Sequence, residues 1–96
     1  MSAYVIVDID VTDPQGYPEY IQLAPATITA YGGKYLARGG KTEVLEGVWI
    51  PKRLVILEFD SIQQARAWLE SPEYQPARQL RHRTAVSNMV VIEGVG

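Results

Sequence analysis

The chain has 96 residues, 47% of them hydrophobic and 21% charged, as expected of a single folded domain over residues 1–96. Its net charge of −2 argues against a nucleic-acid partner, because phosphate binding needs a concentrated positive field. The lack of cysteine excludes disulfides, thiolate metal sites and cysteine nucleophiles, and no apolar run approaches the ~20 residues of a membrane span. We therefore expect a cytoplasmic protein with no membrane partner.

Residues 3–11 predict a strand, because their side chains alternate between two faces. One face carries Val5, Val7 and Ile9, and the other carries Tyr4, Ile6, Asp8 and Asp10. Residues 13–31 predict a helix that starts at Asp13-Pro14, bends near Pro25 and stops at the glycines 32 and 33.

Residues 34–46 predict a second strand region, in which the glycines 39 and 40 allow two interpretations. Either they form a tight hairpin turn, or the strand continues through them with a bulge and turns at Glu46-Gly47. We favour the second interpretation, in which residues 34–46 pair with residues 48–59 in one long bent hairpin. That register places Arg38 almost opposite Ile56 and diagonal to Glu58.

The near-continuous apolar run 53–59 is typical of a central strand that is covered on both faces. Ser61 and Gln64 match a capping box at the start of a helix, and Ser71-Pro72 predicts a second helix start. Residues 87–93 predict the last strand. The order β-α-β-β-α-β indicates an α+β, ferredoxin-like fold, a four-stranded antiparallel sheet with helices on one face.

The face of this sheet that carries no helices is predicted to be apolar. Alternation places Tyr4, Ile6, Leu54 and Ile56 on it, and such a surface is too apolar to leave in water. A second copy of the sheet is the simplest cover. We therefore expect a homodimer with a barrel-like interior, a dimeric α/β barrel.

Five segments form a recognisable set, namely DVTDPQGYPEYIQLAP, YGGKYLARGG, EVLEG, PKRLVILEF and SPEYQPARQLR. Together they resemble the bacterial family known as domain of unknown function 1330 (DUF1330), over nearly the whole chain. The resemblance implies the fold and the dimer described above, in a group that includes cofactor-independent monooxygenases and lactone isomerases. Arg81-His82-Arg83 departs from the family pattern, which has no histidine there, so no role shared across the family is expected for His82.

Three charged residues are predicted to share the helix-free face of the sheet, namely Asp8, Arg38 and Glu58. Buried charges are costly unless they are paired, so this cluster is either a structural ion pair or a binding site. As a site, Arg38 would hold a carboxylate, and Glu58 or Asp8 would serve as an acid or base.

Other candidate ligand-binding residues are aromatic or basic. Five aromatic residues either pack in the core or line a pocket between sheet and helices, namely Tyr20, Tyr31, Tyr35, Trp68 and Tyr74. A basic cluster either complements the dipole of a helix end or anchors a carboxylate or phosphate, and it consists of Arg78, Arg81, His82 and Arg83. One histidine gives no metal site, and neither GxGxxG nor GxxxxGK is present, so no cofactor is expected.

The sequence is compatible with two functions. The first is a binding module that holds a small anionic or aromatic metabolite through Arg38, Tyr35, Glu58, Trp68 or Arg81. The second is a cofactor-independent enzyme, monooxygenase- or isomerase-like, with Glu58 or Asp8 as base and Arg38 as its electrostatic partner. We favour the first, since no pair of nucleophile and base can be recognised in the sequence.

Overall fold

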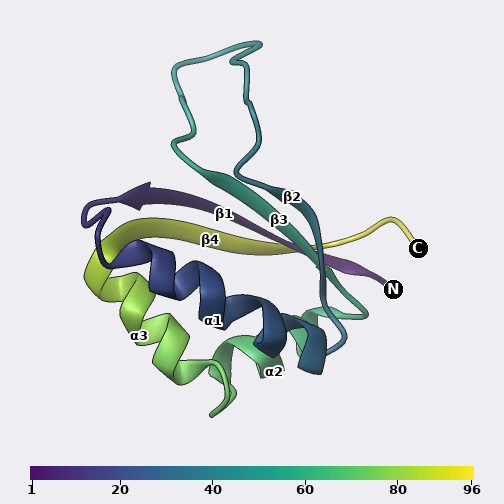
Figure 1. The fold of residues 1–96 in the computed structure, drawn as a ribbon. Coiled ribbons are helices and arrows are strands. Elements are labelled where there is room, and N and C mark those ends of the chain that lie inside the picture. Colours follow the sequence, from purple (N-terminus) through teal and green to yellow (C-terminus); the bar gives the residue numbers. More distant parts are fainter.

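The computed structural model describes residues 1–96, and its helices pack against one face of a single four-stranded antiparallel sheet (Figure 1). The elements in chain order are β1 (Ala3–Val11), α1 (Tyr17–Ala30), β2 (Lys34–Arg38), β3 (Leu54–Phe59), α2 (Ile62–Glu70), α3 (Gln75–Thr84) and β4 (Ala85–Glu93). The strand order is β2-β3-β1-β4, with the first and third strands in the centre. The ferredoxin-like arrangement is therefore confirmed. None of the three helices has the length and apolarity needed to cross a lipid bilayer.

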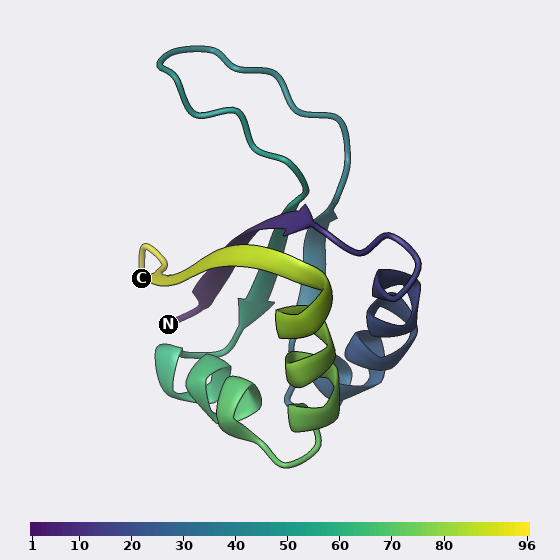
Figure 2. The ribbon, with the colours of Figure 1, turned by 90° about the vertical axis from the view of Figure 1, so that its left-hand side faces the viewer.

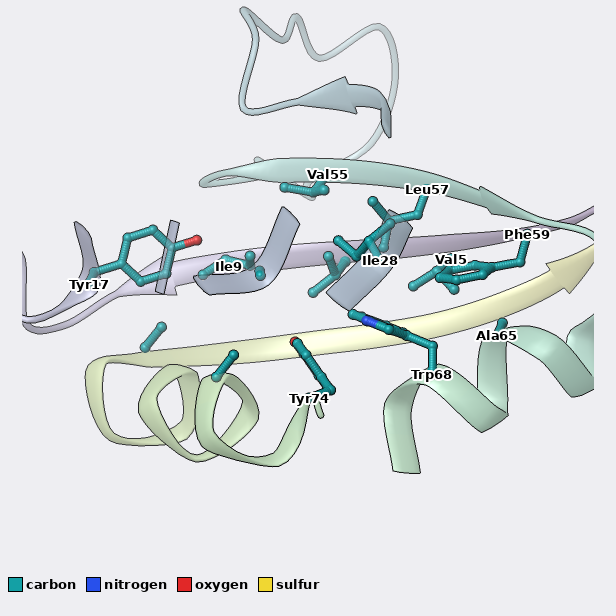
Figure 3. Close-up of a cluster of buried hydrophobic side chains, with 14 residues drawn as sticks. Val5, Ile9, Tyr17, Ile28, Val55, Leu57, Phe59, Ala65, Trp68 and Tyr74 are labelled. Atoms are coloured by element: carbon teal, nitrogen blue, oxygen red, sulfur yellow. The ribbon is translucent and has the colours of Figure 1, made fainter. Parts of the chain in front are cut away.

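The core lies between the helices and the sheet, and strand alternation determines which side chains enter it. Along β1, Val5, Val7 and Ile9 are buried on the helix side, as the period-two pattern predicts. Figure 3 shows Val5 and Ile9 beside the buried residues of β3 and the aromatic side chains of Trp68 and Tyr74, which reach up from below the sheet. Trp68 lies near the centre of this cluster, with 1% of its surface exposed.

The helix α1 begins at Tyr17 and not at residue 13, because the segment before it forms a separate turn. Asp13 Oδ1 accepts hydrogen bonds from the backbone N–H groups of Gln15 (3.1 Å) and Gly16 (3.2 Å). An Asx turn of this kind competes with the first turn of a helix. The predicted stop is confirmed, since Gly32 follows the helix with a φ of +75°, a conformation that glycine adopts without strain.

Neither interpretation of the glycines 39 and 40 is correct. The strand β2 ends at Arg38, and residues 39–53 form a long loop without strand pairing, the 39–53 loop, which rises beyond the sheet (Figures 1 and 2). Gly39 has a φ of +66°, and the Arg53 guanidinium occupies the space that a side chain at this position would need. The backbone therefore leaves the strand conformation here, and the ladder ends with the Gly39 N–H donating to Leu54 O at 2.9 Å.

A β-bulge is present, but it lies earlier than predicted. Tyr35 pairs with Leu57 and Ala37 with Ile56, so Leu36 is the extra residue, and Arg38 then pairs with Val55. Leu57 and Val55, on the helix side of β3, thus each keep a helix-side partner on β2.

A serine cap starts α2, and a turn around Ser71 leads to α3, which begins later than the predicted start at Ser71-Pro72, with Tyr74 as its N-cap. The Ser61 hydroxyl accepts from the Gln64 N–H at 3.0 Å, which confirms the predicted cap of α2. The Ser71 hydroxyl accepts from the Tyr74 N–H at 3.2 Å and donates to Trp68 O at 2.7 Å. This turn directs both Trp68 and Tyr74 into the core, and α3 then starts at Gln75.

Candidate functional site

The predicted cluster of Asp8, Arg38 and Glu58 does not form, because these residues lie on opposite faces of the sheet. Arg38 pairs with Val55, which is buried on the helix side, whereas Glu58 pairs with Lys34 on the helix-free side. Asp8 is also on the helix-free side, opposite Leu54. The predicted register was wrong because the bulge lies at Leu36 and not at the glycines.

The two carboxylates have structural partners of their own. Glu58 Oε1 lies 3.3 Å from Lys34 Nζ, and hydrogen bonds from Ser2 and Lys34 lower the pKa of its carboxyl group. Asp8 accepts hydrogen bonds from Trp49 Nε1 at 2.9 Å and from the Lys52 N–H at 2.8 Å. Partial burial opposes ionisation of Asp8, but these hydrogen bonds outweigh it and lower its pKa. Both carboxylates are thus held ionised and hydrogen-bonded, so neither is suited to act as a base.

A cavity of about 330 Å³ lies between α2, α3 and β4, on the helix side of the sheet. We call it the basic cavity because four of its lining side chains are Arg66, Arg78, Arg81 and His82. The remaining lining is mostly apolar and consists of Val5, Ala65, Trp68, Leu69, Ser87, Met89, Val90 and Val91. No carboxylate lines it.

Three buried polar atoms beside this cavity have no hydrogen-bond partner, namely Arg78 Nε, Arg81 Nε and Ser87 Oγ. Arg78 is partly neutralised, since its Nη1 lies 3.4 Å from Glu70 Oε1. Arg81 forms no salt bridge, although only 4% of its surface is exposed. An unpaired buried charge is costly, so the arrangement calls for an anion that completes it.

Helical spacing brings the basic groups together. Arg78, Arg81 and His82 are related by three and four residues along α3, so they lie on one side of that helix. Burial, then the charges of Arg81 and Arg78, lower the pKa of the His82 imidazole. The sequence pointed to Arg81 as a ligand residue, and the structure places it in the cavity. His82 was set aside, although its spacing from Arg78 would have indicated the same side of the helix.

Trp68 serves mainly as a core residue, and Figure 3 shows it below the sheet beside Phe59 and Tyr74. Its ring centroid lies 5.4 Å from that of Phe59 and 4.2 Å from that of Tyr74. Trp68 Nε1 donates to Thr27 Oγ1 at 3.1 Å, so its only polar atom is satisfied within the fold. One part of Trp68 nevertheless lines the basic cavity.

A second, much smaller cavity of about 20 Å³ lies on the same side of the sheet, between α1 and the strands β2 and β3. Its lining includes Tyr17, Tyr20, Tyr35, Arg38 and Arg53. The Arg38 guanidinium lies 4.7 Å from the ring centroid of Tyr35, and that of Arg53 lies 5.8 Å from the ring centroid of Tyr17. Tyr35 and Arg38, predicted as ligand residues, are thus together, but away from Glu58.

No group of three or more His, Cys, Asp or Glu side chains is placed to hold a metal ion.

Comparison with known proteins supports the fold. No curated protein sequence is significantly similar to the chain. A protein of unknown function from Rhodopseudomonas palustris has a similar structure, with a TM-score of 0.78 at 17% identity over 99% of this chain and 83% of that one.

Two further solved structures share the fold at low sequence identity. SnoaB, a cofactor-independent oxygenase from Streptomyces nogalater, has a TM-score of 0.68 at 10% identity over 99% of this chain and 94% of that one. A dimeric, ferredoxin-like protein of unknown function from Bacteroides fragilis has a TM-score of 0.55 at 18% identity over 97% and 96% of the two chains. The family model for the domain of unknown function DUF1330 matches residues 2–95, and the chain therefore belongs to that family.

Proposed function

We propose that the chain forms a homodimer in which each subunit binds a small anionic metabolite with an apolar or aromatic body. The ligand lies in the basic cavity, with its anionic group at Arg81 and Arg78. The observation that carries this proposal is the set of unpaired buried atoms around that cavity, Arg78 Nε, Arg81 Nε and Ser87 Oγ. The volume of about 330 Å³ matches a ligand of modest size.

The apolar part of the lining supports an apolar or aromatic ligand body. Met89 and Val91 of β4 face Leu69 and Trp68 of α2 across the cavity. A carboxylate or phosphate without such a body would leave this surface in contact with water. A guanidinium binds carboxylates and phosphates in bidentate fashion, so Arg81 is suited to either anion.

The single histidine of the chain offers a direct test. The charged side chains that line the cavity with His82 are Arg66 on α2 and Arg78 and Arg81 on α3, and β4 contributes none. Glu70 on α2 does not line the cavity but reaches Arg78. A bound anion adds negative charge, so it should raise the depressed pKa of the imidazole. We expect benzoate, as a probe, to shift the His82 NMR titration to higher pH. By linkage, benzoate should bind more tightly at about pH 5.5 than at about pH 7.5, a range that spans the ordinary histidine pKa of ~6.5.

Two arginine variants show whether this effect belongs to the cavity. Arg81→Met should abolish the shift, whereas Arg83→Met should preserve it, because Arg83 has the same charge on the same helix but does not line the cavity. An unchanged His82 titration in wild-type protein at millimolar concentrations of benzoate, acetate and inorganic phosphate would contradict the proposal.

The homodimer is proposed through the helix-free face. Large apolar side chains are exposed on it along β4, namely Val86, Val90 and Ile92. The 39–53 loop adds further exposed apolar surface on the side of the sheet away from the helices, including Leu45 (93% exposed) and Val48 (98% exposed). Two solved structures with a similar fold are described as dimeric. A second copy of the chain would cover the β4 surface and the 39–53 loop at once.

A single charge on the central strand β3 tests the dimer. In light scattering, the wild-type protein should have twice the mass of the chain, and Ile56→Glu should have the mass of a monomer. A carboxylate at the centre of an apolar interface would be buried without a partner in both subunits. Leu23→Glu, a matched control on the exposed surface of α1, should remain dimeric. A monomeric wild type at micromolar concentration would contradict the proposal.

Cofactor-independent proton transfer, of the monooxygenase or isomerase type, is the second candidate. It is supported by the position of His82 beside two guanidinium groups in the cavity, where the lowered pKa of the imidazole favours its neutral form. The fold shared with an oxygenase also supports it. Glu58 and Asp8 have no part in it, since both face away from this cavity. Exchange of the α-hydrogens of phenylacetate for deuterium in D2O, followed by NMR, would indicate the enzyme, since benzoate has no acidic C–H to report proton transfer.

A further inference from the structure

The distribution of charge on the helix side of the sheet is strongly one-sided. Of the six arginines in the chain, five line the two cavities there, namely Arg38, Arg53, Arg66, Arg78 and Arg81. None of the eleven acidic residues lines either cavity. In a chain whose net charge is −2, this segregation concentrates positive potential in one layer.

The arginines at the smaller cavity also lack acidic partners, but they are less buried than Arg81, since Arg38 is exposed and Arg53 is half-buried. Neither Arg38 nor Arg53 forms a salt bridge, and Arg53 Nε is the fourth buried polar atom of the chain without a hydrogen-bond partner. Both side chains reach the same opening, because the bulge turns Arg38 to the helix side and Arg53 lies directly before Leu54, across from Gly39. The Arg53 guanidinium lies in the space that the missing side chain of Gly39 leaves open.

The neighbouring tyrosines add neutral hydrogen-bond donors. Burial is the main cause of the raised pKa of both Tyr17 and Tyr35, although Arg53 and Arg38, respectively, oppose it. Their hydroxyl groups therefore stay protonated at neutral pH and can donate to an anion. Two guanidinium groups and two phenols without a nearby carboxylate form a donor set that suits a carboxylate or phosphate.

We propose that Arg38 and Arg53 bind a second anionic group, so that the ligand of this protein is a dianion with an apolar middle. The proposal rests on the proposed function, because the first anionic group occupies the basic cavity. Trp68 and Met89 line both cavities, and no other residue does. At about 20 Å³ the smaller cavity has room for about one water molecule, so a carboxylate and its chain enter it only when the flexible thioether of Met89 changes rotamer.

The experiment uses linear dicarboxylates from succinate to sebacate, each paired with the monocarboxylate of the same chain length, in calorimetric titrations. For wild-type protein we expect one chain length to bind best, and its dicarboxylate to bind about tenfold or more tightly than its monocarboxylate. Arg53→Met should remove the preference for the dicarboxylate and leave monocarboxylate binding unchanged. Methionine is chosen because its side chain replaces the apolar stem of Arg53 beside Gly39. Lys52→Met removes the same charge outside both cavities and should change nothing.

The variants also separate one spanning ligand from two independent anions. For one ligand, the effects of Arg53→Met and Arg81→Met on the best dicarboxylate should be coupled in a double-mutant cycle. Additive effects, together with sulfate binding that only Arg53→Met removes, would overturn the spanning ligand. Equal affinity of dicarboxylates and monocarboxylates would overturn the second anion position while leaving the proposed function intact. No binding of any carboxylate would overturn both.

Discussion

Arg81→Met should stabilise the ligand-free protein and at the same time weaken anion binding by about 100-fold or more. The guanidinium is 4% exposed, has no salt bridge, and leaves Nε without a hydrogen bond. Even a paired buried charge can often be replaced by apolar residues of similar volume with a gain of up to about 1–4 kcal/mol, and an unpaired charge such as Arg81 has no attraction to a partner to lose. The loss in affinity follows from two charge-assisted hydrogen bonds, each worth about 1.5–3 kcal/mol.

Thermal unfolding and benzoate titration of the same samples measure the two effects. One kcal/mol corresponds to roughly 4–8 °C in Tm for a domain of this size. Arg83→Met should leave both quantities near their wild-type values, because Arg83 is exposed at the end of the same helix. A lower Tm for Arg81→Met would mean that Arg81 supports the fold, and it would remove the reason to expect an anion beside it.

Trp68→Ala should destabilise the protein by about 3–5 kcal/mol, which is a large part of the stability of a 96-residue domain. The substitution removes the ring that stacks between Phe59 and Tyr74 and leaves Thr27 Oγ1 without its indole donor. It also joins the two helix-side cavities, since Trp68 lines both. Trp68→Phe keeps most of the stacking and should cost much less.

The other tryptophan supplies the matched control. Trp49 is 59% exposed on the 39–53 loop and makes one hydrogen bond, to Asp8. In the Ile56→Glu background, in which no second copy covers the loop, Trp49→Ala should cost no more than about 2 kcal/mol in urea unfolding followed by circular dichroism. Equal costs for the two alanine variants would contradict the assignment of Trp68 to the centre of the core.

The parts of the fold that follow from local periodicity could be predicted from the sequence. Alternation along residues 3–11 identified the buried face of β1, and the apolar run from residue 54 identified β3 as a central strand. The cap at Ser61 and the stop at Gly32 also follow from local chemistry. These features depend on interactions within a few residues, which a single sequence displays directly.

The candidate site could not be predicted in the same way, because it depends on one residue of register. The spacing of Arg38 and Glu58 suggested a shared face, and only the pairing of β2 with β3 shows that the bulge falls at Leu36. The basic cavity, in turn, requires the relative placement of α2, α3 and β4, which are not encoded in any local pattern. The spacing of Arg78, Arg81 and His82 was visible, but the lack of acidic partners around them was not.

The bulge at Leu36 also changes how related sequences should be aligned. Tyr35 and Arg38 are three residues apart, a spacing that in an unbroken strand puts two side chains on opposite faces. In this chain they share a face, because Leu36 adds one position without a partner. A relative that lacks the extra residue would place the same tyrosine and arginine two residues apart, so Tyr-x-x-Arg and Tyr-x-Arg are equivalent in space. We expect a one-residue gap at position 36 to align the arginine correctly, where an ungapped alignment would report it as missing.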